Sequence, residues 1–123
     1  MSLVDAVRDG DTAAVRALLL QRPRVDVNAP EGDGTTALHW AAHRGDLATV
    51  DLLLRAGAKA TSANALGVTP LSLAAEAGSA AVVERLLKSG AAPNTTLKGG
   101  ETVLMTAARA GRLEVVRALV EAG

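Results

Sequence analysis

The sequence predicts an all-α solenoid of stacked helix-turn-helix pairs, and two observations carry this prediction. The first is an ungapped period of 33 residues, in which the same residue types recur three times. The second is the spacing of Leu and Val within each copy, which places them on one face of two short helices. Helices of about 8–10 residues are not stable alone, so neighbouring pairs are expected to stack. The recurring positions include Gly34/Gly67/Gly100, Thr36/Thr69/Thr102, Leu38/Leu71/Leu104, Gly45/Gly78/Gly111 and Val50/Val83/Val116.

A further copy occupies the N-terminus. Leu3, Ala6 and Gly10 fall 35 residues before Leu38, Ala41 and Gly45, with the two extra residues in the connection around 21–24. We therefore expect one domain over residues 1–123, divided into four repeats at about 1–33, 34–66, 67–99 and 100–123.

Each helix has start and stop signals. Ser2 and Asp5 have the spacing of a capping box, so the first repeat is expected to open with a helix. In the second repeat, the Thr36 side chain is expected to cap a helix over 37–44, and Gly45 to end it in a left-handed turn. A second helix follows over about 47–55. The third and fourth repeats follow the same scheme from Thr69 and Thr102, with connecting segments near 26–35, 59–68 and 92–101.

Composition limits the possible function classes. The 13 basic and 13 acidic side chains balance, which argues against nucleic acid or an anionic membrane surface as the main partner. The chain has no cysteine, so disulfides and thiolate chemistry are excluded. There is no apolar run of the roughly 18–20 residues that span a bilayer, and the N-terminus does not resemble a secretory signal. We expect a cytoplasmic protein.

The repeated pattern resembles the ankyrin repeat. The motif Gly-x-Thr-Pro-Leu-x-x-Ala-Ala matches 34–42, 67–75 and 100–108, and the second half of the repeat is clearest at 111–123. The resemblance implies L-shaped units of two antiparallel helices and a hairpin-like loop. It also implies a surface that binds another protein, on the concave side formed by the loops and the first helices.

The copies depart from the family pattern at several positions. The proline of the motif is present only as Pro70, and its histidine only as His39. The family's acidic residue three positions before the glycine is Glu31, then Asn64, then Leu97. We therefore expect weaker hydrogen bonding in the loops, most of all in the last one.

The sequence contains no convincing catalytic, metal or cofactor site. His39 and His43 have a spacing that can bind metal, but no third ligand is evident. We interpret His39 as the structural histidine of the family, bonded near the helix start and loop, and His43 as an exposed residue. Gly32–Gly34 and Lys98–Gly100 lack the full spacing of a phosphate-binding loop. We predict no enzyme activity and no cofactor.

Partner-binding candidates are the loop and first-helix positions that vary between copies. Trp40 either packs toward Leu73 only or also contacts a partner, and Leu66 and Val68 either form an apolar centre or pack on neighbouring loops. The candidates are Asp33, Thr35, Trp40, His43, Arg44, Leu66, Val68, Glu76, Ala77, Lys98, Glu101 and Arg109.

The predicted function is a non-enzymatic protein–protein interaction module whose partner is an unidentified protein. The alternative is a substrate-recruiting or inhibitory part of a larger regulatory or enzymatic assembly. Val115, Val116, Leu119 and Val120 resemble an interior repeat rather than a polar end. We therefore expect exposed apolar surface at the C-terminal end, where self-association or further repeats would cover it.

Overall fold

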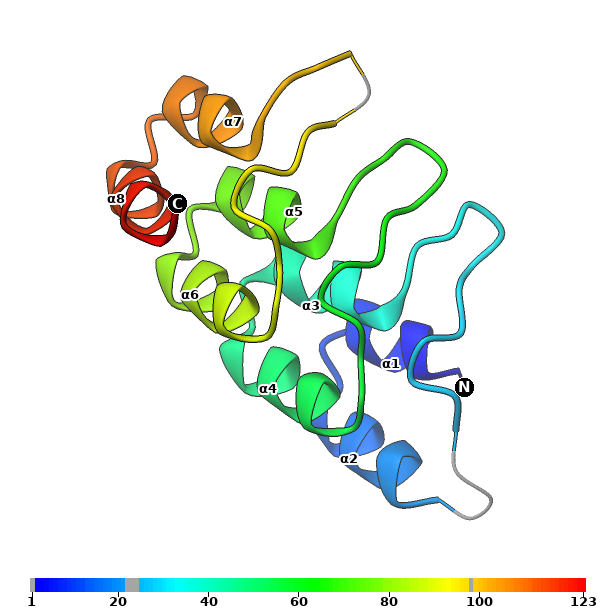
Figure 1. The fold of residues 1–123 in the computed structure, drawn as a ribbon. Coiled ribbons are helices and arrows are strands. Elements are labelled where there is room, and N and C mark those ends of the chain that lie inside the picture. The colour runs from blue at the N-terminus through cyan, green and yellow to red at the C-terminus, as the bar shows by residue number, and fades with distance from the viewer. Residues whose placement is uncertain (1, 22–24, 98) are drawn as a thin grey trace.

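The computed structural model describes residues 2–21, 25–97 and 99–123, which fold into eight helices in four consecutive pairs (Figure 1). The helices have 6 to 10 residues, and no helix of these ranges is both long and apolar enough to cross a membrane. Their bounds are α1 Leu3–Arg8, α2 Thr12–Leu20, α3 Ala37–Arg44, α4 Leu47–Arg55, α5 Pro70–Ala77, α6 Ala80–Lys88, α7 Val103–Arg109 and α8 Leu113–Ala122.

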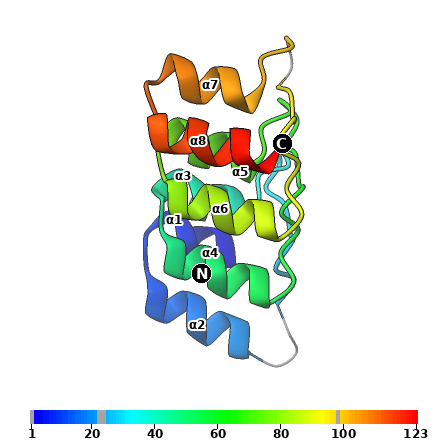
Figure 2. The ribbon, with the colours of Figure 1, turned by 60° about the vertical axis from the view of Figure 1, so that its left-hand side comes forward.

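The pairs stack side by side in two rows of helices. The first helices of the repeats, α1, α3, α5 and α7, contact one another in order, and so do the second helices α2, α4, α6 and α8 (Figure 1). Figure 2 shows the helices stacked one above another, with the long segments that connect successive repeats along one edge of the stack. The predicted all-α stack of helix pairs is confirmed.

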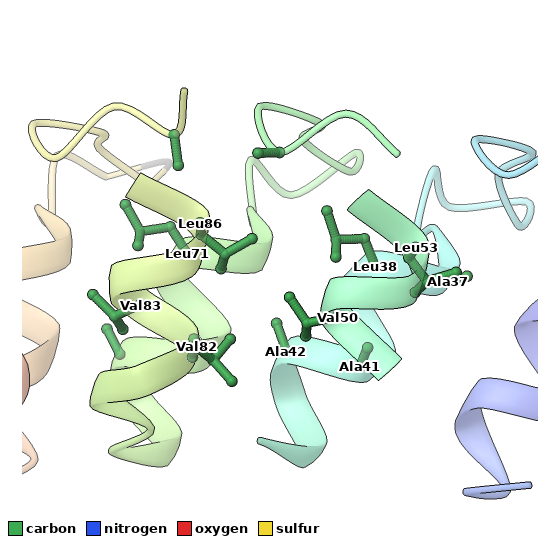
Figure 3. Close-up of a cluster of buried hydrophobic side chains, with 14 of the residues drawn as sticks. Ala37, Leu38, Ala41, Ala42, Val50, Leu53, Leu71, Val82, Val83 and Leu86 are labelled. Atoms are coloured by element: carbon green, nitrogen blue, oxygen red, sulfur yellow. The ribbon is translucent and has the colours of Figure 1, made fainter. Parts of the chain in front are cut away.

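The core is a thin layer of Leu, Val and Ala between the two rows. Leu38 and Leu53 are buried in the second repeat, and Leu71 and Leu86 are buried at the same positions of the third (Figure 3). The Ala41 and Ala42 side chains have no exposed surface. Because alanine side chains are short, they allow neighbouring helices to approach closely.

Local signals set the ends of the helices. The capping box of Ser2 and Asp5 is present, α3 and α4 have the predicted bounds, and Gly45 ends α3 with a φ of 66°. The hydroxyls of Thr69 and Thr102 accept bonds from backbone N–H groups in the first turns of α5 and α7.

Thr36 begins α3 in a capping box that it forms with His39. The backbone N–H of Thr36 donates to His39 Nδ1 at 3.1 Å, and the Thr36 Oγ1 lies 2.9 Å from the same nitrogen. The imidazole thus takes the place that a Glu or Gln side chain usually has in such a box. The cap predicted at Thr36 is therefore shared with His39, whose ring reaches back to the start of the helix.

The same backbone bond closes each connecting loop. The N–H groups of Glu31, Asn64 and Leu97 donate to the carbonyls of Thr35, Val68 and Glu101 at 2.8, 3.0 and 2.7 Å. Asn64 Oδ1 also accepts from the N–H of Val68 at 3.0 Å, which the apolar side chain of Leu97 cannot do. The expected weakening of the last loop thus applies to this side-chain bond, whereas the backbone bond is kept.

Adjacent loops also contact each other directly. The N–H of Ala65 donates to the carbonyl of Asp33 at 2.8 Å. At Gly34, which has a φ of +85°, a Cβ atom would lie 3.2 Å from Asn64 Cα. Glycine is needed here because both the backbone conformation and the neighbouring loop oppose a side chain.

Candidate partner-binding surface

His39 joins α3 to the loop of the next repeat. Its Nε2 lies 2.8 Å from the carbonyl oxygen of Val68, and its Nδ1 accepts from the N–H of Thr36. Since a carbonyl can only accept, Nε2 carries the proton and the ring is neutral. Burial lowers the pKa of His39, and the bond to Val68 and the charge of Asp33 only partly oppose this effect.

These bonds confirm the structural interpretation of His39. Both of its ring nitrogens are engaged, so neither can bind a metal ion without breaking a bond inside the fold. Within residues 2–21, 25–97 and 99–123, no group of three His, Asp or Glu side chains could hold a metal ion.

Trp40, on the next position of α3, is half-buried and held in a defined orientation. Its Nε1–H donates to Glu31 Oε1 at 3.0 Å, and the guanidinium carbon of Arg8 lies 5.7 Å from the ring centroid. Glu31 also accepts from Arg8 at 3.4 Å. The imidazole of His43 meets the indole edge-on, with centroids 6.0 Å apart. The ring therefore packs within the protein and still presents part of its surface to solvent.

A groove of about 320 Å³ opens beside Trp40. It lies where α3 meets the loops of two successive repeats, and Leu73 of α5 forms part of its wall. The groove is lined by Asp33, Thr35, His39, Trp40, His43, Asn64, Val68 and Leu73. Five of the predicted partner-binding residues, Asp33, Thr35, Trp40, His43 and Val68, thus meet at one hollow.

Leu66 and Val68 differ in their surroundings. Leu66 is 68 % exposed at the tip of its loop, whereas Val68 is half-buried and lines the groove. The N–H groups of both residues donate to Asn64 Oδ1, at 2.9 and 3.0 Å. The Asn64 side chain therefore fixes the backbone that presents these two apolar residues.

Ten of the predicted residues lie at least partly exposed on the first helices and loops, and we call this set the inner face. It comprises Asp33, Trp40, His43, Arg44, Leu66, Val68, Glu76, Ala77, Glu101 and Arg109. Lys98 lies outside the described residues.

Thr35 does not belong to this set, because it is buried. Its N–H donates to Asp33 Oδ1 at 3.0 Å, and its Oγ1 accepts from Asn64 Nδ2 at 3.2 Å. Thr35 thus connects two loops of the protein and offers little surface to a partner.

Charged groups of the inner face are oriented by local bonds. The N–H of Thr35 holds the pKa of Asp33 below its ordinary value. Hydrogen bonds from Arg109 and Thr106 lower the pKa of Glu101, and the bond with Glu101 raises the pKa of Arg109. Arg44 donates to the carbonyl of Arg8 at 3.2 Å, at the end of α1.

The predicted set omitted three residues that shape this site, namely Glu31, Asn64 and Leu73. Leu73 lines the groove beside Trp40, as expected, although it is not among the predicted partner-binding candidates. Glu31 and Asn64 share the position three residues before the loop glycine, which marks them as loop residues. Nothing in the sequence indicates that Glu31 bonds to Trp40.

The expected apolar surface at the C-terminal end is confirmed, although only in part by the residues named for it. Val115 and Leu119 are buried and Val116 is half-buried, whereas Val120 is 62 % exposed. The remaining exposed apolar side chains of α7 and α8 include Leu104, Met105 and Leu113.

Comparisons with known proteins agree with this architecture. A family model described as ankyrin repeats (3 copies) matches residues 3–97 and 60–123. A probable E3 ubiquitin-protein ligase of Oryza sativa subsp. japonica is 40 % identical over 62 residues, which are 50 % of this chain and 12 % of that protein. Oxysterol-binding protein-related protein 1 of Rattus norvegicus is 44 % identical over 62 residues, which are 50 % of this chain and 6 % of that protein.

The chain therefore spans only a small part of the length of these relatives. Ankyrin repeat domains are generally protein-interaction modules and are usually non-catalytic on their own. The match of the family model to most of the chain, together with the four stacked helix pairs, shows that this chain belongs to the ankyrin repeat family.

Proposed function

We propose that this chain is a non-enzymatic module that binds a protein partner on its inner face. The observation that carries the proposal is the fixed, half-exposed Trp40 beside the groove. Tryptophan is among the residues that most often dominate binding energy at protein interfaces. Because Glu31 and Arg8 already orient the ring, a partner would lose less conformational entropy in ordering it.

The surroundings of Trp40 fit this role. Val68 and the exposed Leu66 add apolar surface from the adjacent loop. The charged Asp33 also lines the groove, and Arg44 is exposed on the same helix as Trp40. An apolar centre with a polar rim is the common layout of a protein interface.

The proposal is tested by capturing proteins from a lysate of the source organism on the immobilised chain. We expect Trp40→Ala and Leu66→Ser to lose the proteins that the wild type retains. The matched control is Leu20→Ser at the end of α2, away from the inner face, where the leucine is 80 % exposed. Circular dichroism verifies that all three variants are folded. Equal capture by the wild type and both inner-face variants would contradict the proposal.

We propose as a second candidate that the chain acts within a larger assembly, with contacts at α7 and α8. Leu104, Met105 and Val120 are exposed there, and the matched relatives are much longer proteins. Self-association is the contact that can be tested with this chain alone. Sedimentation velocity over a range of concentrations should show association of the wild type, and less association of Leu104→Ser/Val120→Ser. A wild type that stays monomeric throughout argues against self-association.

A further inference from the structure

We propose that the groove beside Trp40 takes a lysine or arginine side chain of the bound protein. The aliphatic stem of that side chain would lie against Trp40, Val68 and Leu73, and its cationic head would reach Asp33. This inference rests on the proposed function, because it names the chemistry by which the inner face selects its partner.

The polar groups of the groove are largely satisfied within the protein. His39 is bonded to Thr36 and Val68, Thr35 and Asn64 are bonded to each other, and the Trp40 indole is bonded to Glu31. Two polar side chains are exceptions: the imidazole of His43, which packs edge-on against Trp40, and the carboxylate of Asp33, which is exposed and carries a full charge. For Asp33, the local bonds leave that charge available. Its Oδ1 accepts from the N–H of Thr35, and among the described residues Asp33 takes part in no ion pair.

The charges around the groove favour a cation. Asp33 is the one Asp, Glu, Lys or Arg among the lining residues that the structure describes. The guanidinium that lies over Trp40, that of Arg8, is already paired with two carboxylates, those of Asp5 and Glu31. An acidic side chain entering the groove would therefore meet the like charge of Asp33, whereas a basic one would meet an opposite charge.

The walls of the groove suit an amphipathic side chain better than a wholly apolar one. Trp40, Val68 and Leu73 supply apolar surface, and long basic side chains lay their methylene stems along such surface while the charged end stays near water. A leucine or phenylalanine in the same place would desolvate the Asp33 carboxylate without pairing it, which is unfavourable.

The ring of Trp40 already makes a cation–π contact with one cation of the protein. The guanidinium carbon of Arg8 lies 5.7 Å from its ring centroid, a distance at which cations are attracted to the indole. A second basic group from a partner would use the same property of the ring, together with the charge of Asp33.

The test uses a displayed library of random peptides, selected on the wild-type chain and counter-selected on Trp40→Ala. We expect the enriched peptides to share a lysine or arginine. Capped synthetic versions of one such peptide are then made with lysine, norleucine or glutamate at that position. Because Trp40 is the only tryptophan in the chain, its fluorescence and its indole N–H signal in NMR spectra report on the groove directly.

We expect the lysine peptide to bind about threefold tighter than the norleucine peptide, the scale of a solvent-accessible ion pair, and the glutamate peptide to bind weakest. Asp33→Asn keeps the oxygen that accepts from Thr35 but removes the charge, so it should abolish the preference for lysine. Glu84→Gln, which removes an exposed charge on α6, is the matched control and should keep the preference.

The outcomes separate this inference from the proposed function. If no peptide is enriched over Trp40→Ala, the proposed function fails and the inference fails with it. If peptides are enriched but lack a basic residue, only the inference is overturned. Equal affinity of the lysine and norleucine peptides, or a lysine preference that survives in Asp33→Asn, also overturns the inference alone.

Discussion

The second and fourth repeats have nearly the same sequence pattern but different surroundings. Leu38 of α3 is 1 % exposed, whereas Leu104, at the same position of α7, is 40 % exposed. Helix α5, the first helix of the next repeat, packs on α3. In the described residues, no first helix of a further repeat packs on α7 in this way. Equivalent residues thus contribute differently because burial depends on the neighbouring repeat.

The next position shows the same contrast in polar contacts. His39 bonds to the start of its own helix and to the loop of the following repeat. Met105 takes its place in the fourth repeat and is exposed. A repeat position therefore has a fixed place in the helix, but its contribution to stability depends on whether a neighbouring repeat covers it.

The largest expected difference in the free energy of unfolding is between variants of Leu38 and Leu104. Leu38→Ala should lower the free energy of unfolding by about 2–5 kcal/mol, because it leaves a cavity in a packed layer. Leu104→Ala should lower it by less than about 1 kcal/mol, because much of that side chain is already in water. Urea unfolding followed by circular dichroism measures both. Equal losses would show that α7 is covered in solution.

The next largest difference in the free energy of unfolding is expected between variants of His39 and Met105. His39→Met copies the residue of the fourth repeat. It leaves the N–H of Thr36 without its partner and removes one of the two bonds to the carbonyl of Val68, which still accepts from Asn64. We expect a loss of about 1–3 kcal/mol. The reverse change, Met105→His, should stay within about 0.5 kcal/mol of the wild type. The same urea experiment applies, and a neutral His39→Met would refute the bridging role of the ring.

A smaller difference is expected at the starts of the second helices. Asp46 caps α4 by accepting from the N–H of Thr49 at 3.2 Å, whereas Arg112, at the same position of α8, makes no side-chain cap. Asp46→Ala should cost about 1 kcal/mol. Arg112→Ala removes an exposed bond to the carbonyl of Glu76 and should have a smaller effect. Thermal unfolding ranks the two variants, and the opposite order would contradict this prediction.

The smallest expected effect is a dependence of stability on pH. The folded state lowers the pKa of His39 from its ordinary value of 6.5, so the unfolded chain binds a proton at a higher pH than the folded chain. The free energy of unfolding should therefore be highest above pH 6.5 and should fall as the pH drops below that value.

The carboxylates of Asp5, Asp33 and Glu101 act in a separate range. Their pKa values are lowered from 3.8 or 4.5, so their stabilisation is lost only at still lower pH. Urea midpoints at about pH 8 and about pH 5 should thus differ less in His39→Met than in the wild type. An equal difference in both proteins would exclude His39 as the cause.

Local signals predicted the helices well because caps and stops act within a few residues. The box of Ser2 and Asp5, the glycine at Gly45 and the apolar spacing of α4 involve neighbours in the sequence. The box at the start of α3 is also local, because the ring of His39 lies three residues from Thr36. The other bond of that ring, to Val68, reaches the next repeat.

The candidate site was harder to predict, because its residues are brought together from different repeats. Trp40 was identified from its residue type, but its contact with Arg8 spans two repeats. Thr35 was placed on the surface because its position varies between copies, yet Asn64, 29 residues away, binds its hydroxyl. Such contacts follow from the stacking of neighbouring repeats, and the spacing of residues along the sequence does not predict them.

The repeat period, the helix pairs and the side of each helix on which Leu, Val and Ala recur can all be predicted from the sequence alone. These follow from helix periodicity and from the conformational preferences of glycine, threonine and proline, which are local properties. The folded structure is needed to show which equivalent positions are buried, which loops bond to each other and where a groove opens. Those features depend on contacts between repeats, because a side chain is covered only when another part of the chain lies against it.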